Sequence, residues 1–253
     1  MKNYSAKCKI LQFLIVILIF VFWVLPFKAA EAALIIQAPK YIGLNSGLVG
    51  YWSFDGKDMA GNTAYDRSGQ NNNGTLTNGP KRAIGKIGQG LSFDGSNDYI
   101  SISNFCSSIS NTAGTISAWV KPNVDNQGTD NNDYIFNCGG VAAHSPSLLI
   151  LGGTIPEYRI IKSTVATIAT TRPKVNVWVH LVVTWNTSIQ TIYVNGIQED
   201  SDTTASITPS GSATIGQYPD VPSGTWPGLI DDVRVYNRAL SGDEIKRLYN
   251  LGR

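Results

Sequence analysis

Charged side chains are scarce in this sequence. Only 15% of its 253 residues are Asp, Glu, Lys or Arg, and the formal net charge is +2. Four lysines and Glu31 lie within the first 32 residues, so the remainder of the chain carries a net charge of −1. Nucleic-acid-binding domains usually carry a stripe or cluster of basic residues. The chain beyond its N-terminal segment has no such stripe, and we expect no nucleic-acid partner.

Cysteine is also rare, with three residues in the chain. Cys8 precedes an apolar run, whereas a lipidated cysteine would follow it. Cys106 and Cys138 have no histidine at the spacing of a zinc site. An even pair of cysteines readily forms a disulfide in an oxidising compartment, although the sequence contains no information on their distance. A disulfide between Cys106 and Cys138 and a role as two small buried residues both remain open.

The N-terminus has the layout of an export signal. Three lysines in the first nine residues precede an apolar run from Ile10 to Phe27, and the small-x-small site Ala30-Glu31-Ala32 follows. The run is also long enough to span a bilayer, so residues 1–32 are either a signal peptide or an uncleaved membrane anchor. In both cases the rest of the chain is expected outside the cytoplasm, secreted or at the cell surface, with membrane contact only through this segment.

Most of the remaining chain predicts short β-strands. Segments rich in Val, Ile, Thr, Tyr and Trp alternate with clusters of Gly, Asn, Asp and Pro. Residues 33–46 are expected to be a linker or edge strand, and residues 47–253 a single antiparallel two-sheet sandwich. The predicted strands are Gly47–Phe54, Gly90–Phe93, Tyr99–Ile102, Gly114–Lys121, Tyr134–Cys138, Ser147–Leu151, Tyr158–Lys162, Trp178–Trp185, Thr191–Val194, Ala213–Ile215 and Gly228–Tyr236.

One helix is predicted, at the C-terminus. Ser241 and Glu244 have the spacing of a capping box, and apolar residues then recur at helical spacing. We expect a helix from about Gly242 to Asn250 that packs on the sandwich. Four tryptophans lie within predicted strands and are expected to be buried in the core: Trp52, Trp119, Trp178 and Trp185.

Several segments in order resemble the bacterial laminin G-like domains of the concanavalin A-like lectin/glucanase superfamily. This resemblance runs from about Leu48 to the C-terminus and implies an all-β, two-sheet antiparallel jelly roll with a short C-terminal helix. The segments that carry it are Gly50–Asp55, Asp66–Gly69, Asn73–Leu76, Gly85–Gly95, Asp98–Ile100, Ile116–Pro122, Trp178–Leu181, Thr184–Trp185, Tyr193–Gly196 and Gly228–Ser241.

The resemblance also implies a structural calcium ion. Related domains often hold Ca²⁺ with ligands from an early Asp/Asn/Gly loop and a late Asp-Asp strand. The matching residues are Asp66, Asn73, Asp231 and Asp232. Oxygen ligands of this kind are those that Ca²⁺ prefers. The alternative is that Asp66 forms a turn and that one of the adjacent aspartates pairs with a nearby arginine.

No catalytic residue is expected. Glycosidases use paired carboxylates, but the four glutamates of this chain are far apart in sequence. Asp231 and Asp232 are adjacent, and neighbouring residues of a regular strand point to opposite faces. His180 lies in a predicted strand and is expected to be structural, and His144 has no acidic neighbour. A divergent glycoside hydrolase is therefore the least favoured alternative.

Three polar loops, 56–73, 125–133 and 217–227, are expected to hold the binding site. Tyr218, Asp220 and Trp226 lie in the last of these loops, among three prolines, and are candidate sugar contacts. Aromatic residues that cap the end of the core are the alternative interpretation. The sequence thus predicts a non-catalytic recognition or adhesion module for a glycan or an extracellular protein. A structural part of a surface or appendage assembly is the alternative.

Overall fold

The computed structural model describes residues 43–124, 132–139, 146–152, 157–162, 165–203, 209, 211–218 and 224–253. The predicted export segment and most of the predicted linker lie outside these residues. Residues 39–253 form one compact unit, and both hydrophobic clusters described below lie entirely within it. This unit therefore contains its own core. Among the described residues, no helix has the length and hydropathy needed to cross a bilayer.

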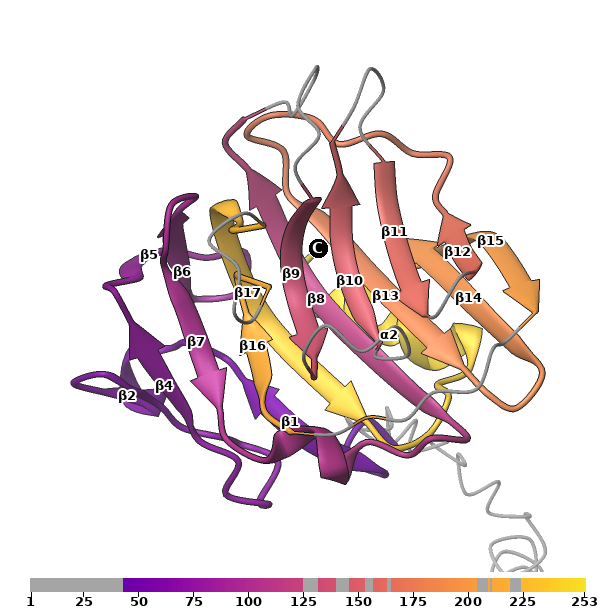
Figure 1. The fold of residues 1–253 in the computed structure, drawn as a ribbon, viewed down its shortest axis with the longest axis horizontal. Helices are drawn as coiled ribbons and strands as arrows, with labels where there is room; N and C mark the ends of the chain where they lie inside the picture. Colours follow the sequence, from indigo (N-terminus) through magenta and orange to yellow (C-terminus); the bar gives the residue numbers. More distant parts are fainter. Residues whose placement is uncertain are drawn as a thin grey trace, which may run out of the picture. The chain divides into compact units, whose positions relative to one another are not determined.

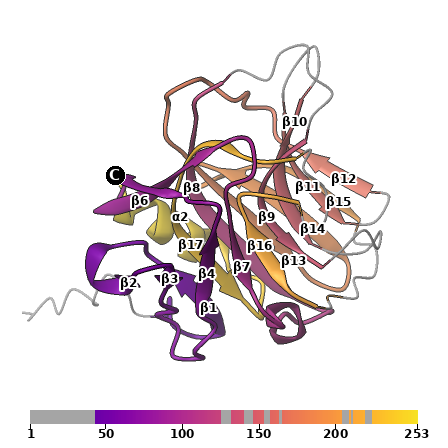
Figure 2. The same ribbon diagram turned by 60° about the vertical axis from the view of Figure 1, so that its left-hand side comes forward.

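The fold is a sandwich of two antiparallel sheets, as predicted (Figure 1 and Figure 2). Sheet A has eight strands, in the order β15 (Ile197–Thr203), β14 (Ile189–Val194), β13 (Val179–Trp185), β8 (Gly114–Pro122), β17 (Pro227–Tyr236), β6 (Gln89–Asp94) and β5 (Lys81–Ile84), with β1 (Leu48–Trp52) paired to β17. Sheet B has nine, in the order β12 (Val165–Ile168), β11 (Glu157–Lys162), β10 (Ser147–Leu151), β9 (Asn132–Cys138), β16 (Ala213–Ile215), β7 (Tyr99–Ile102), β4 (Gly74–Thr77), β3 (Thr63–Ala64) and β2 (Met59–Ala60).

All eleven predicted strands are confirmed, with ends that shift by a few residues. Six further strands are present: β2, β3, β4, β5, β12 and β15. Most of the six are four residues long or shorter. The longest, β15, has the polar sequence Ile-Gln-Glu-Asp-Ser-Asp-Thr and forms one end of sheet A. An edge strand tolerates this composition because only one of its sides is paired and much of it faces water.

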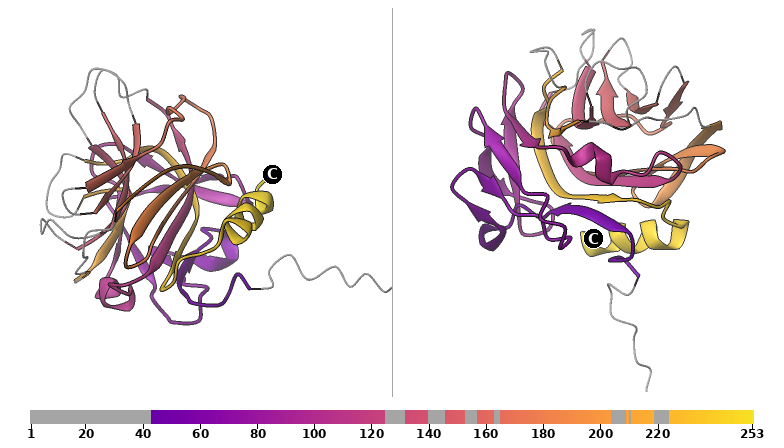
Figure 3. Two further views of the ribbon diagram at one scale, coloured as in Figure 1. Left: turned by 90° about the vertical axis from the view of Figure 1, so that its right-hand side faces the viewer. Right: turned by 60° about the horizontal axis from the view of Figure 1, so that its bottom comes forward.

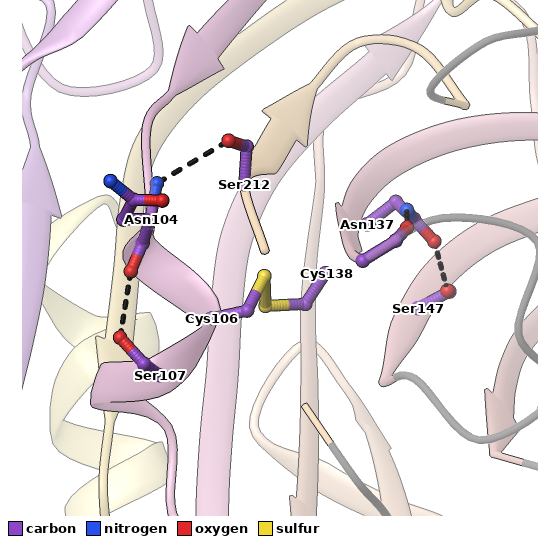
Figure 4. The surroundings of a disulfide bond; sticks show 8 residues. Asn104, Cys106, Ser107, Asn137, Cys138, Ser147 and Ser212 are labelled. Atoms are coloured by element: carbon purple, nitrogen blue, oxygen red, sulfur yellow. Dashed lines mark hydrogen bonds between the residues drawn. A yellow bond between two sulfur atoms is a disulfide. The ribbon is translucent and has the colours of Figure 1, made fainter. Parts of the chain in front are cut away.

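The main core lies between the two sheets. Inward-facing apolar side chains alternate with outward-facing polar ones, as on Ile100 and Ile102 of β7 and on Ile116, Ala118 and Val120 of β8. Within this core, a disulfide links Cys106, in the short 3-10 helix η2 (Phe105–Ser108), to Cys138, at the end of β9 (Figure 4). Both cysteines are fully buried.

A second, smaller cluster lies on the outer face of sheet A. There, helix α2 (Gly242–Leu251) packs Ile245 and Leu248 against Val182 and Tyr236 of the sheet (Figure 3). The predicted capping box is confirmed: the Glu244 N–H donates to Ser241 Oγ at 3.3 Å, and the Ser241 N–H donates to the Glu244 carboxylate at 2.9 Å. The bond from Arg238 to Glu244 also holds the pKa of this carboxyl down, at about 2.

Two tryptophans lie in places that differ from those predicted. Trp52 and Trp185 are fully buried between the sheets, and Trp119 is buried on the outer face of sheet A, where its ring stacks on Tyr249 of α2. Trp178 was expected in the core, but it precedes β13 and is only half-buried, with Lys121 Nζ 5.6 Å from its ring centre. Trp226 was predicted as a sugar contact, with packing at the end of the core as the alternative, and it is fully buried within the core.

Candidate functional site

The described ends of two of the three predicted binding loops, 125–133 and 217–227, meet at one end of the sandwich. Gly224, near the end of the 217–227 loop, accepts hydrogen bonds from the N–H of Tyr134 at 3.3 Å and from the N–H of Tyr218 at 3.1 Å. Gly224 has φ +119°, and a Cβ there would lie 3.0 Å from the Asn132 oxygen and 3.2 Å from Tyr134 Cδ2. Glycine thus permits both the conformation and this close approach. The third loop, residues 56–73, is held against β1 instead, where Asn72 Nδ2 donates to Val49 O.

The junction of the two loops presents a pair of tyrosines. The rings of Tyr134 and Tyr218 lie 4.7 Å apart, centre to centre, at an angle of 46°. Both side chains are half-buried. Burial, reinforced by the neighbouring Tyr218, raises the pKa of the Tyr134 hydroxyl, so this group stays neutral at physiological pH. A neutral phenol both donates and accepts hydrogen bonds, and its ring offers an apolar face.

The outer face of sheet B extends this surface with uncharged polar side chains. Because Ile100 and Ile102 point into the core, Tyr99 and Ser101 of β7 point outward. The strand register places one polar row straight across five strands, formed by Thr75, Ser101, Thr214, Asn137 and Ser147. The last three are buried and bonded to protein: Ser147 Oγ donates to Asn137 Oδ1 at 2.5 Å, and Thr214 Oγ1 donates to Gln217 O at 2.5 Å (Figure 4 shows the first).

The predicted sugar contacts have different outcomes. Tyr218 belongs to the tyrosine pair. Trp226 does not reach the surface, because its side chain is 0% exposed and packs in the main core, which is the alternative that the sequence left open. Asp220 lies outside the described residues. Tyr134 was predicted only as a strand residue. Its place as an aromatic residue directly after the polar loop 125–133 is the sequence signal by which it could have been found.

The four predicted calcium ligands are engaged in contacts within the protein. Asp66 accepts bonds at both carboxylate oxygens, from the N–H groups of Tyr51, Ser68 and Asn72, and Asn73 Oδ1 accepts from the Asp66 N–H. These are the turn contacts named as the alternative. Across the described ranges, no three His, Cys, Asp or Glu side chains gather as a metal site would require. These contacts do not fit a free ligand set, and the calcium ion stays a prediction.

The expectation that Asp231 and Asp232 face opposite sides is wrong. A β-bulge between Asp231 and Arg234 inserts one residue relative to β8, and Asp232 adopts a left-handed conformation with φ 49°. The bulge turns both carboxylates toward the outer face of sheet A. Asp232 forms a buried ion pair with Arg234, with Oδ1 2.9 Å from Nε. Asp231 Oδ2 accepts the N–H groups of Lys86 and Ile87, while its buried Oδ1 has no partner.

Burial sets the charge of these outer-face groups. It raises the pKa of Asp231 to about 7, with the neighbouring charge of Asp232 acting in the same direction. Burial also lowers the pKa of His180 to about 3, helped by Arg234, so this histidine is neutral. Its Nε2 lies 2.9 Å from Ser117 Oγ, which agrees with the predicted structural role.

The glutamates of the described residues act as local anchors. Glu157 pairs with Arg159 and Arg172, and Glu199 accepts bonds from Thr170 and Thr171. Glu244 belongs to the helix cap. Each of these three glutamates is thus bonded to its own partners within the protein.

Known proteins share this fold. Residues 94–246 match a family described as the concanavalin A-like lectin/glucanases superfamily. Domain 4 of an extracellular arabinanase from Geobacillus stearothermophilus, solved in complex with arabinotriose, superposes with a TM-score of 0.62 at 23% identity, over 81% of this chain and 98% of that one. No curated protein sequence matches the chain.

Two toxin domains are similar to the same extent. The binding domain of Paraclostridial Mosquitocidal Protein 1 has a TM-score of 0.62 at 20% identity, over 82% of this chain and 52% of that chain. The receptor binding domain of botulinum neurotoxin D has a TM-score of 0.62 at 18% identity, over 82% of this chain and 53% of that chain. The chain therefore spans about half the length of these two structures. At such identities the likeness establishes the fold.

Proposed function

Because this chain belongs to the laminin G type 3 family of the concanavalin A-like lectin/glucanases superfamily, we propose that it is an exported, non-catalytic module that binds a glycan. The binding surface is the end of the sandwich where residues 132–134, 217–218 and 224–225 meet. The observation that carries this proposal is the half-buried Tyr134–Tyr218 pair, held there by two backbone bonds to Gly224.

The chemistry of this surface suits a neutral sugar. Tyrosine rings present apolar faces to the C–H groups of a pyranose or furanose ring, and their hydroxyls bond to sugar hydroxyls. The adjoining outer face of sheet B continues with Tyr99, Ser101 and Thr75, which are polar and uncharged. Such groups bind hydroxyls without the desolvation cost of a charged side chain.

The similar structures support a binding role. One of them was solved with a bound arabinotriose, and two are named as binding or receptor-binding domains. Export is supported by the buried disulfide, because such bonds persist mainly in oxidising compartments. A non-catalytic role is supported by the three described glutamates, each of which is bonded to partners within the protein.

The test is binding by residues 34–253 to a glycan array and, in titration calorimetry, to arabinotriose. We expect Tyr134→Ala and Tyr218→Ala each to weaken the binding of array hits by about fivefold or more, since a ring contact contributes roughly 1 kcal/mol or more. Tyr65→Ala is the matched control. Tyr65 is a tyrosine with 43% exposure that lies in the loop 56–73, which is held against β1 and does not belong to the proposed site.

Thermal melting of each variant verifies that it is folded. Unchanged glycan binding by both folded tyrosine variants would contradict the proposed site. Binding to no glycan, together with capture of a protein receptor, would move the assignment to the protein-binding alternative.

A further inference from the structure

A third tyrosine lies on the same outer face as the Tyr134–Tyr218 pair. Tyr99 of β7 points outward, because the adjacent Ile100 points into the core. Tyr134 of β9 points outward as well, since it lies opposite Leu149 of β10, which is flanked by two residues of the main core and does not belong to it. The outer face of sheet B thus presents aromatic rings on two different strands.

The strand register sets Tyr99 and Tyr134 in line across the sheet. One row across β7, β16 and β9 is formed by Ser101, Thr214 and Asn137. Tyr99 is the next outward residue of β7 toward the proposed binding surface, and Tyr134, past the bulge in β9, is the next outward residue of that strand. Because β16 lies between β7 and β9 (Figure 1), the two tyrosines are about 10 Å apart, or two strand spacings. This distance exceeds the width of a single sugar ring.

The path between the two tyrosines crosses the end of β16. Ile215, the last residue of this strand, points into the core, and the next residue is Gly216, which adds no side chain to the surface. The Gly216 N–H donates to Ile135 O at 3.0 Å, so the chain stays beside β9 here. A ligand that passes from Tyr134 to Tyr99 therefore meets a glycine at this position in place of a bulky side chain.

Aspartates flank these tyrosines, and basic residues do not. Asp98 and Asp133 directly precede Tyr99 and Tyr134 and are 4% and 5% exposed. Lys81 of β5 acts on Asp98 electrostatically and offsets its charge in part. The stretches around the tyrosines contain three aspartates and neither lysine nor arginine: 94–101, 132–136 and 214–218. They offer no cation to a negatively charged sugar, and their carboxylates disfavour one.

We propose that this surface binds a neutral, linear oligosaccharide laid across β9, β16 and β7, with one sugar ring on the Tyr134–Tyr218 pair and a later one on Tyr99. This inference rests on the proposed function and specifies its ligand class: a segment of several consecutive units, not a single sugar. Each ring stacks its C–H face on a phenol ring. The outward hydroxyls of Ser101 and Thr75, which pair across β7 and β4, lie beside this path and can bond to sugar hydroxyls.

The experiment is titration calorimetry of residues 34–253, which include the whole unit that contains both cores. The ligands are linear arabino-, xylo- and cello-oligosaccharides from the monosaccharide to the hexasaccharide, together with the length series of any other neutral array hit. Oligogalacturonides form the anionic series. In a neutral series that binds, we expect affinity to rise by about fivefold or more from the monosaccharide to the trisaccharide, because one further ring contact contributes roughly 1 kcal/mol or more. We expect no binding of oligogalacturonides.

Variants assign this gain with length to Tyr99. Tyr99→Ser should remove most of the gain, because it deletes the second aromatic contact. Tyr134→Ala should weaken the binding of the monosaccharide itself, because it deletes the first. Tyr65→Ser is the matched control and should keep the full gain, since Tyr65 lies in the loop 56–73. Thermal melting verifies that each variant is folded.

The outcomes separate this inference from the proposed function. Equal affinity for a monosaccharide and its trisaccharide would overturn the inference and leave the proposed glycan site intact. A full gain with length in the folded Tyr99→Ser variant, or oligogalacturonide binding as tight as that of the neutral series, would also overturn it. Binding of no sugar at all would instead refute the proposed function, and this inference with it.

Discussion

The outer faces of the two sheets differ in how deeply their polar residues are buried. On sheet A, Asp231, Asp232, Arg234 and His180 are at most 5% exposed, on the face where α2 and the segment before β1 pack (Figure 3). On sheet B, Tyr99, Ser101 and the Tyr134–Tyr218 pair are only half-buried. The first face contains charges that must be compensated within the protein, whereas these four residues of the second face present neutral groups that can bond to a ligand.

This difference indicates that the outer face of sheet A stabilises the fold and that the outer face of sheet B is better suited to bind a partner. Buried charges are costly unless they are paired and hydrogen-bonded, so the groups of sheet A are committed to one another. Arg234 lies between Asp232 and the Tyr51 ring, 4.1 Å from its centre, and Asp232 keeps the Arg234 pKa above its ordinary value despite burial. Side chains so engaged are unsuited to bind a partner. The neutral face of sheet B has no such commitment at Tyr99 and Ser101, and this favours it as the recognition surface.

The largest expected effect comes from breaking the buried ion pair. Arg234→Ala leaves Asp232 buried without its partner, and the free energy of unfolding should fall by about 3–5 kcal/mol in urea denaturation. The double variant Asp232→Asn/Arg234→Met removes both charges and should recover much of this loss. Lys246→Ala on the exposed side of α2 is the control. A loss below about 1 kcal/mol for Arg234→Ala would show that the covered face is not held by this pair.

An intermediate effect is expected from Asp231 and pH. Its pKa is raised from 3.8 to about 7 in the folded protein, so the unfolded chain ionises first as pH rises. The stability that the neutral carboxyl maintains below pH 3.8 is therefore lost progressively up to about pH 7, by roughly 1–4 kcal/mol.

Asp231→Asn keeps an acceptor for Lys86 and Ile87 but cannot ionise. Measured by urea denaturation at several pH values, the variant should gain stability relative to the unmodified protein as pH rises through this window. Asp243→Asn, at an exposed position of α2, is the control. A constant difference between Asp231→Asn and the unmodified protein at all pH values would refute the assignment.

The smallest effect is expected on the open face. Tyr99→Ser should lower the free energy of unfolding by no more than about 1 kcal/mol, because its side chain is half-exposed and points away from the core. A loss as large as that for Arg234→Ala would abolish the contrast between the two faces.

Sequence patterns predicted those elements whose local signal is strong. The alternation in Tyr99–Ile102 and the β-branched run of β13 identified their strands, and Ser241 with Glu244 identified the start of α2. The polar strand β15 was not predicted because it is an edge strand with no buried residue, so its sequence lacks the alternation of apolar and polar residues that marks a strand. Trp178 was wrongly assigned to the core and Trp226 to the binding surface, because the sequence does not show which residues a tryptophan contacts in the folded protein.

The two-sheet sandwich, its turns and its helix cap could be predicted from the amino-acid order, because these depend on residue alternation and on contacts only a few positions apart. Tertiary structure alone decided that a bulge turns Asp231 and Asp232 to one face and that two loops bring Tyr134 beside Tyr218. Both outcomes depend on residues more than eighty positions apart or on strand register, which the packing of the whole sheet sets.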